Sequence, residues 1–229
     1  MKNKKLFIFL FACALVLSLG IINPTKVGAG TNDLTVSTLS SEIIDGDDLF
    51  NDDNICVIDI EEESIPLAVI KKSTNSKVRN LNSSELSKLK NNLIKVINTT
   101  RKKQAKNKTV SKLSTLEKTG SIRANEIVKK WSHTRPNGKT WVTVLTNYGI
   151  SKKSLKAGEN LAKVSLNAQA SYTSSQLTQI SNAIHKSLMN SATHKKVILN
   201  QNYKKVGIGI RSEVKDGKLK LYITEHFKN

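Results

Sequence analysis

Ser132-His133-Thr134-Arg135-Pro136-Asn137-Gly138 is the stretch around which the rest of the chain is arranged. It follows a helical pattern that ends at Trp131, and a Pro followed by Asn-Gly cannot continue a helix. The chain is therefore expected to turn here and to present His133 and Arg135 at the end of an element, where binding groups are often displayed. On these seven residues alone, a plain helix stop with a solvated histidine is an equal alternative.

The first 29 residues of the 229 have the layout of a secretory signal peptide. Three lysines lie in Met1–Lys5, an apolar run covers Leu6–Ile22, and small residues at Val27–Ala29 suit a signal peptidase. An uncleaved membrane anchor is the alternative, although the apolar run is short for one. We expect a secreted, extracellular protein that associates with the cell wall.

The two cysteines determine whether the mature chain can form a disulfide bond. Cleavage near Ala29 would remove Cys13 and leave Cys56 alone, so that no intrachain disulfide forms. The folded domain must then be held by its core, or by its core and a metal. Cys56 is either a free thiol or an intermolecular partner, and the sequence does not decide between these or fix an oligomeric state.

Charge divides the chain into an acidic segment and a basic domain. Of the 18 acidic residues, 11 lie between Asp33 and Glu63, where Lys and Arg are absent. From Lys71 onward there are 33 basic and 7 acidic residues, a net charge of +26. Such a polycation attracts polyanions, and for an exported protein we expect cell-wall polyanions or anionic lipids rather than nucleic acid. A Lys-rich solvated surface without a specific ligand is the alternative.

Residues 30–80 are predicted to be a poorly ordered segment because they are rich in Ser, Asp and Asn. Two apolar patches, Ile55–Ile58 and Ile65–Ile70, could dock on the basic domain as strands. We therefore hypothesise that this segment is a pro-region or an electrostatic cover for the domain at 81–229.

The domain at 81–229 reads as α+β, with helices around a small antiparallel sheet. A capping box at Asn82 and Glu85 opens a helix of about 20 residues that ends near Lys103. The remaining elements are a helix from Ser111 to Trp131, a helical turn at 141–145, a helix at 171–190, and strands at 206–210 and 219–223 around an Asp216-Gly217 turn. Gly158–Ala162 is interpreted as a carboxylate and an amide behind a flexible glycine.

Two histidines and one glutamate form the candidate site. His133 and His194 lie at predicted helix ends, and Glu159 lies between them in sequence. Two imidazoles and a carboxylate can hold a divalent metal with an open position, or act as an acid/base pair. The spacing alone does not bring the three together. The sequence contains no H-E-x-x-H, no G-x-S-x-G, no P-loop and no Rossmann glycine pattern.

Five segments in order resemble the CAP superfamily of cysteine-rich secretory, antigen 5 and pathogenesis-related proteins, in its bacterial SCP-like branch. They are Arg123–Glu126, Ser132–Gly138, Gly158–Ala162, Met189–Leu199 and Val206–Ile210. The resemblance implies an α-β-α sandwich with a cleft lined by two His and two Glu. Carried over, these positions are His133, Glu159 and His194, with Ser191 in place of the second Glu. Some members bind zinc or magnesium in the cleft, and others bind sterols or fatty acids elsewhere.

These observations support three functional hypotheses. In the first, the protein is an exported binding protein whose cleft holds Zn²⁺ or another divalent cation through His133, Glu159 and His194, with Arg135 or Ser191 facing the ligand. In the second, it is a metal-assisted hydrolase of peptide, ester or wall-polymer bonds with Glu159 as the base. In the third, the basic surface binds and the cleft is scaffolding. The alternative for the cleft itself is that its His and Glu merely satisfy each other's buried hydrogen bonds.

Overall fold

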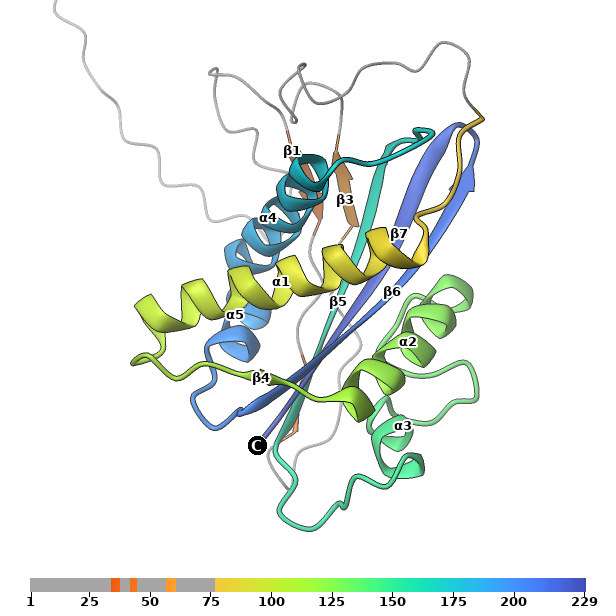
Figure 1. Cartoon of the computed structure of the whole chain (residues 1–229). Coiled ribbons are helices and arrows are strands. Elements are labelled where there is room, and N and C mark those ends of the chain that lie inside the picture. Colours follow the sequence, from red (N-terminus) through yellow and green to blue (C-terminus); the bar gives the residue numbers. More distant parts are fainter. Residues whose placement is uncertain (1–33, 38–41, 45–56, 61–76) are drawn as a thin grey trace, which may run out of the picture. The chain divides into compact units, whose positions relative to one another are not determined.

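The computed structural model describes residues 34–37, 42–44, 57–60 and 77–229. The predicted signal peptide at 1–29, Cys56 and the apolar patch at Ile65–Ile70 lie outside these residues. Five helices belong to the described part of the chain (Figure 1): α1 (Ser83–Gln104), α2 (Ser114–Lys129), α3 (Val142–Asn147), α4 (Ser174–Asn190) and α5 (Ala192–Leu199). Among these described helices, none is long and apolar enough to span a membrane.

Local sequence signals explain where the two longest helices, α1 and α4, begin. The Asn82 side chain accepts from the Glu85 backbone, and the Glu85 carboxylate accepts from the Asn82 backbone, so the predicted capping box forms. Thr173 and Gln176 make the same exchange at the start of α4. These caps satisfy backbone donors that the first helical turn leaves unpaired.

A mixed sheet forms the centre of the domain. Its strands are β1 (Leu34–Ser37), β2 (Glu42–Ile44), β3 (Val57–Ile60), β4 (Ser111–Lys112), β5 (Ala157–Asn167), β6 (Lys205–Lys215) and β7 (Lys218–Lys228). Their order is β1-β3-β5-β7-β6-β4, and β2 also pairs with β5. The predicted hairpin is confirmed: β6 and β7 pair antiparallel along 11 residues, and Asp216 and Gly217 have φ of 53° and 72° at the turn.

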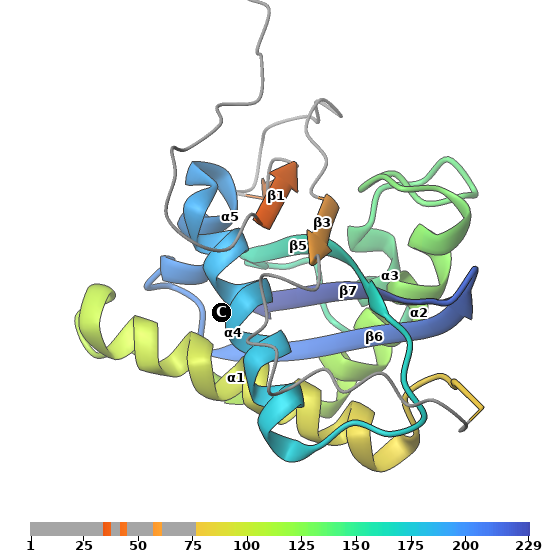
Figure 2. The same cartoon turned by 90° about the horizontal axis from the view of Figure 1, so that it is seen from above.

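Helices cover both faces of the sheet, as the α-β-α sandwich requires (Figures 1 and 2). On one face, α1, α4 and α5 enclose the main core, where Leu93 of α1 and Ile184 of α4 meet sheet residues such as Ile208. On the other face, α2 and α3 enclose a smaller core around Leu116 and Trp141. The sequence-based α+β fold class is therefore confirmed.

One predicted helix start was wrong, and two further elements were not predicted. Ser111–Lys112 does not start a helix but forms β4, because Ser111 and Leu113 donate to the backbone of the segment leading into β6 and of β6 itself. Gly158–Ala162, for which no strand was predicted, belongs to strand β5, so Gly158 is a strand residue rather than a flexible one. The residues after Ser191 continue as a separate helix, α5, which the sequence analysis did not predict.

Helix α2 lies against the sheet with its backbone in direct contact. A Cβ added to Gly209 of β6 would lie 1.9 Å from the Gly120 carbonyl carbon of α2, and one on Gly207 would lie 2.2 Å from that of Leu116. No side chain larger than hydrogen fits between these backbones. The glycines of β6 therefore set the depth at which α2, with Arg123, sits on the sheet.

Candidate functional site

Two adjacent pairs of polar residues, each formed by one residue of β5 and one of β7, point to opposite faces at the centre of the sheet. Glu159 of β5 is the register partner of His226 in β7, and the next pair is Asn160 with Glu225. Because consecutive strand residues point to opposite faces, the first pair lies on the α2 side and the second on the α5 side. All four residues are buried.

Four donors surround the Glu159 carboxylate. Its Oε1 accepts from His133 Nδ1 at 2.8 Å and Arg123 Nη2 at 3.1 Å, and its Oε2 accepts from Arg123 Nε and His226 Nε2, both at 2.9 Å. Burial alone would raise the pKa of Glu159, but the Arg123 charge and the two histidine hydrogen bonds hold that pKa well below its usual range. The carboxylate is therefore ionised and its acceptor positions are filled.

Arg123 joins this carboxylate to the turn at Ser132–Gly138. Its Nη1 donates to Glu126, and its Nη2 donates to the backbone oxygen of Ser132 at 2.7 Å. Glu126 in turn accepts from Arg135, with Nη2 to Oε1 at 2.6 Å. Arg135 therefore faces Glu126 and the Thr143 hydroxyl, and it anchors the turn to α2 and α3.

His226 continues the network on the α2 side. Its Nδ1 lies 2.9 Å from the Thr119 hydroxyl, and its ring stacks on Trp141 at 5.3 Å between centroids. Burial lowers the pKa of His226, against the opposing effect of Glu159, so the ring is neutral at physiological pH. The hydrogen bonds then assign a proton on Nε2 that is donated to Glu159, with Nδ1 accepting from Thr119.

The second polar pair has fewer partners. Asn160 Nδ2 donates to Glu225 Oε2 at 3.0 Å, whereas Asn160 Oδ1 and Glu225 Oε1 have no hydrogen-bond partner within the described residues. Burial raises the pKa of Glu225 to about 7, and the Asn160 hydrogen bond only partly opposes this. This side of the sheet thus holds a carboxyl group whose pKa burial raises toward neutral pH.

His194 lies on this same side, on α5. Neither of its ring nitrogens has a hydrogen-bond partner in the described part of the chain, and Asn160 Nδ2 is 3.5 Å from its backbone oxygen. Burial, with a further contribution from His133, lowers the pKa of His194 to about 3. Ser191, at the start of α5, is partly exposed, and its hydroxyl bonds Thr193 at 3.0 Å.

The candidate residues are thus only partly brought together. His133 and Glu159 are hydrogen-bonded, which is the arrangement expected if the site merely satisfies its own buried groups, whereas His194 and Ser191 bond neither of them. Among residues 77–229 and the described strands before them, no three His, Cys, Asp or Glu side chains group to hold a metal. A saturated Glu159 does not fit a bound cation without exchanging partners. Zinc binding and hydrolysis with Glu159 as the base therefore stay predictions.

Arg123, Glu225 and His226 belong to the site but were not predicted as members of it from the sequence. Arg123 had a signal: it lies three residues after Gly120 and four before Ile127, at the spacing that places all three on one face of a helix. Glu225-His226 also had one, since two adjacent polar residues interrupt an alternating apolar strand near its end. A buried Arg on a helix and buried polar groups on a strand call for partners from each other.

The chain is similar to a known protein family and to solved structures of bacterial proteins. A family model described as CAP, the cysteine-rich secretory protein family, matches residues 94–227. A cysteine-rich secretory protein from Staphylococcus aureus is a solved structure with 18% identity and a TM-score of 0.43, over 65% of this chain and 40% of that one. An outer surface protein from Borrelia burgdorferi has 18% identity and a TM-score of 0.41, over 67% of this chain and 98% of that one. No curated protein matches the sequence.

The family match covers more than half of the chain, and it spans α2, the turn at 132–138, β5, α5 and the β6–β7 hairpin. These are the elements that carry Arg123, His133, Glu159, His194 and His226. The chain belongs to the CAP family of cysteine-rich secretory proteins.

Proposed function

We propose that this CAP protein is an extracellular binding protein whose basic surface holds an anionic cell-wall polymer. The observation that carries the proposal is the charge of the continuous described domain. Residues 77–229 contain 31 Lys and Arg against 7 Asp and Glu, a net charge of +24. A field of this sign concentrates polyanions at the surface. The signal-peptide pattern at 1–29 supports an extracellular location.

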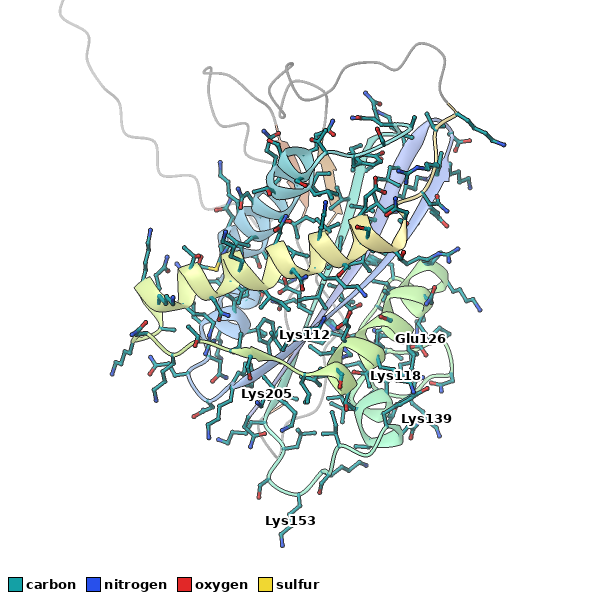
Figure 3. All side chains as sticks on the ribbon, viewed as in Figure 1. Lys112, Lys118, Glu126, Lys139, Lys153 and Lys205 are labelled. Carbon is teal, nitrogen blue, oxygen red and sulfur yellow. The ribbon has the colours of Figure 1, made fainter. Side chains whose placement is uncertain are left out.

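The few acidic groups of this domain are mostly engaged with other residues. Glu85, Glu159 and Glu225 are buried. Glu117 pairs with Lys90 and Lys112, and Glu126 pairs with Arg123 and Arg135. The lysines therefore dominate what a ligand meets, as Figure 3 shows for Lys112, Lys118, Lys139, Lys153 and Lys205.

A polymer fits this surface better than a bilayer does. Peripheral membrane binding combines basic residues with apolar side chains that insert among the lipids. Over residues 77–229, the exposed large apolar side chains are Val78 and Tyr148, and each is 40% exposed. Two isolated apolar groups give little area to insert. Electrostatic attraction along an extended chain needs no such insertion.

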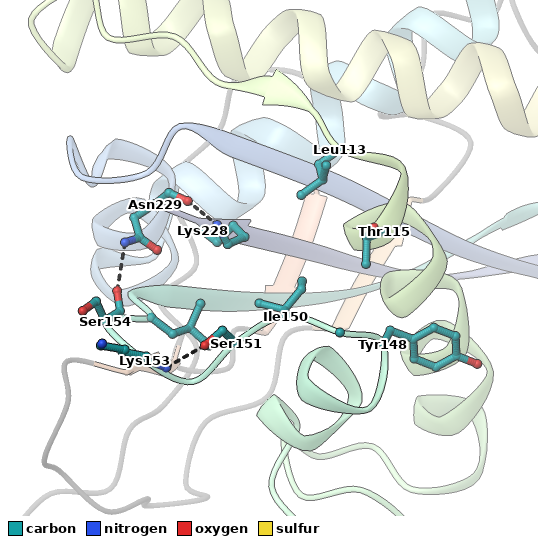
Figure 4. A pocket seen from close by; sticks show the side chains of 11 residues that line it. Leu113, Thr115, Tyr148, Ile150, Ser151, Lys153, Ser154, Lys228 and Asn229 are labelled. Carbon is teal, nitrogen blue, oxygen red and sulfur yellow. Dashed lines mark hydrogen bonds between the residues drawn. The ribbon is translucent and has the colours of Figure 1, made fainter.

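A surface pocket of about 370 Å³ is a candidate binding site for one unit of the polymer (Figure 4). Leu113, Tyr148 and Ile150 contribute its apolar wall, and Lys153 and Lys228 contribute cations. Lys118 lies 4.9 Å above the Tyr148 ring, which adds charge beside an exposed aromatic face. An aromatic ring next to ammonium groups suits a sugar or polyol unit that carries phosphate or carboxylate.

Binding of lipid-free poly(glycerol phosphate) to the full chain tests the proposal. We expect binding at low salt whose affinity falls linearly with salt concentration on logarithmic axes, because counterions are released. The double variant Tyr148→Ala/Lys153→Gln should weaken binding about tenfold, the effect of losing roughly 1.4 kcal/mol. Lys102→Gln, an exposed lysine in the last turn of α1, is the matched control and should leave the affinity within about twofold.

Two outcomes would contradict the proposal. One is the absence of polymer binding at low ionic strength. The other is stronger binding to phosphatidylglycerol vesicles than to the lipid-free polymer at equal phosphate concentration, which would assign the surface to a membrane.

A further inference from the structure

The outer edge of β5 carries two strands from the acidic N-terminal segment. Antiparallel β2 pairs Ile43 with Gly158 and Ile44 with Ala157, and parallel β3 pairs Ile58 with Val164. On its other edge, β5 pairs with β7 along all 11 residues. A long strand with an open edge is a template for another strand, and proteins usually cover such edges.

Charge favours the same partnership. Residues 33–63, which contain β2 and β3, hold 11 acidic residues and no Lys or Arg. The domain that they pair with has a net charge of +24 over residues 77–229. Opposite charges on two parts of one chain raise the local concentration of each at the other, in addition to the effect of the covalent link.

The register places this segment beside the candidate site. The Cα partner of Glu159 is Glu42, so β2 runs along the strand residue that anchors the buried network. Strand β2 also contacts α5, the helix that carries His194. Strand β2 therefore lies beside the backbone of Glu159 and against the helix that carries His194.

We infer that the outer edge of β5 is a strand-accepting surface whose occupant is the chain's own acidic segment, held as a displaceable cover. The paired stretches with β5 are three residues each, and strands this short are marginal by themselves. Backbone pairing gives the segment its register, and charge complementarity gives it its choice of partner. The inference does not depend on which polymer the basic surface binds.

Disulfide trapping in the full chain tests this occupant. In a Cys13→Ser/Cys56→Ser background, Ile44→Cys is combined with Ala157→Cys, since these residues are direct partners whose Cα spacing suits a disulfide. The control pair is Thr35→Cys with Ala157→Cys, because β1 pairs with β3 rather than β5. We expect the first pair to form an intramolecular cross-link at least about tenfold faster than the control, measured by mass spectrometry of unreduced peptides.

Equal rates for the two pairs would overturn the inference. A cross-linked dimer would overturn it as well, because it would assign the edge to a second copy of the chain. The trapping uses no polymer, so a failure of poly(glycerol phosphate) binding would leave this result standing.

A second measurement covers the case in which the cysteine variants fold poorly. Ile43→Pro removes a backbone donor from β2 and should speed amide hydrogen exchange in peptides covering Ala157–Leu161, whereas Thr35→Pro in β1 should change it much less. Unchanged exchange in Ile43→Pro would contradict the paired edge.

Discussion

The two sides of the sheet treat adjacent residues in opposite ways. On the α2 side, the Glu159 carboxylate is charged and accepts from four donors. On the α5 side, Asn160 is the one donor to Glu225 among the described residues, and burial raises the pKa of Glu225 to about 7. The two carboxyl groups belong to neighbouring strands and are one register pair apart.

The difference shows that partners decide whether a buried carboxyl group keeps its charge. Both groups are fully buried, so the desolvation of each is similar. Arg123 supplies a full positive charge on one side, whereas the other side offers an amide. The first carboxylate is therefore locked, and the second can gain or lose a proton near neutral pH.

The largest expected effect comes from removing the charge that locks Glu159. Arg123→Leu leaves a buried carboxylate without its cation and should cost about 3 to 5 kcal/mol of unfolding free energy, measured by urea denaturation. Arg211→Leu, at an exposed position of β6, is the control. Adding Glu159→Gln to Arg123→Leu should recover part of the loss, since no unpaired charge then remains. A loss below about 1 kcal/mol in the single variant would contradict the locked pair.

On the opposite side of the sheet, Glu225→Gln should stabilise the protein at alkaline pH. The pKa of about 7 in the folded protein lies above the ordinary value of 4.5, so the stability that protonation provides is present below pH 4.5 and is lost as pH rises through 7. Relative to wild type, the variant should gain about 3 kcal/mol at pH 8 and nothing at pH 4.5. Glu213→Gln controls for loss of a more accessible carboxylate. A gain that does not change with pH would exclude this explanation.

His194 should give the opposite pH slope on the same side. Its pKa of about 3 in the folded protein lies below the ordinary value of 6.5, so the unfolded chain takes up the proton first and stability falls as pH drops from 6.5 toward 3. His194→Gln should remove about 2 kcal/mol of the loss between pH 7.5 and pH 5. The pKa of His185, lowered by burial to about 4, contributes in the same direction, so His185→Gln should remove a second part. An acid slope that survives both substitutions would point to other groups.

The smallest effect concerns the end of the saturated network. Thr119→Val removes the hydroxyl that bonds His226 Nδ1 and should cost about 1 to 2 kcal/mol, because a buried ring nitrogen is left unpaired. Thr99→Val is the matched control, since that hydroxyl donates to the Lys95 backbone oxygen of its own helix at an exposed position. Equal losses in both variants would show that the His226 contact contributes nothing specific.

Sequence reasoning succeeded where local chemistry decides the structure. The Asn82–Glu85 box and the Asp216-Gly217 turn are complete within a few residues, so helix α1 and the β6–β7 hairpin were predicted. It failed for β5, because the Gly-Glu-Asn stretch is polar. Its burial depends on partners at Arg123 and His226, which are 36 and 67 residues away. His133 and Glu159, both candidates from the sequence, are hydrogen-bonded to each other, but no spacing rule could show that Arg123 also donates to this carboxylate.

The glycines that let α2 rest on β6 have a consequence for how this site can vary. A contact between side chains can be repacked by paired substitutions, whereas the contact of Gly209 with Gly120 has no side chain to exchange. Main-chain contacts thus fix the position of α2 on the sheet. This position sets the distance over which Arg123 reaches Glu159. Changes elsewhere in the two cores can alter stability without altering that distance. A change in the chemistry of Glu159 would therefore have to begin with substitution of its hydrogen-bond donors, because the main-chain contact of α2 with β6 has no side chain to vary.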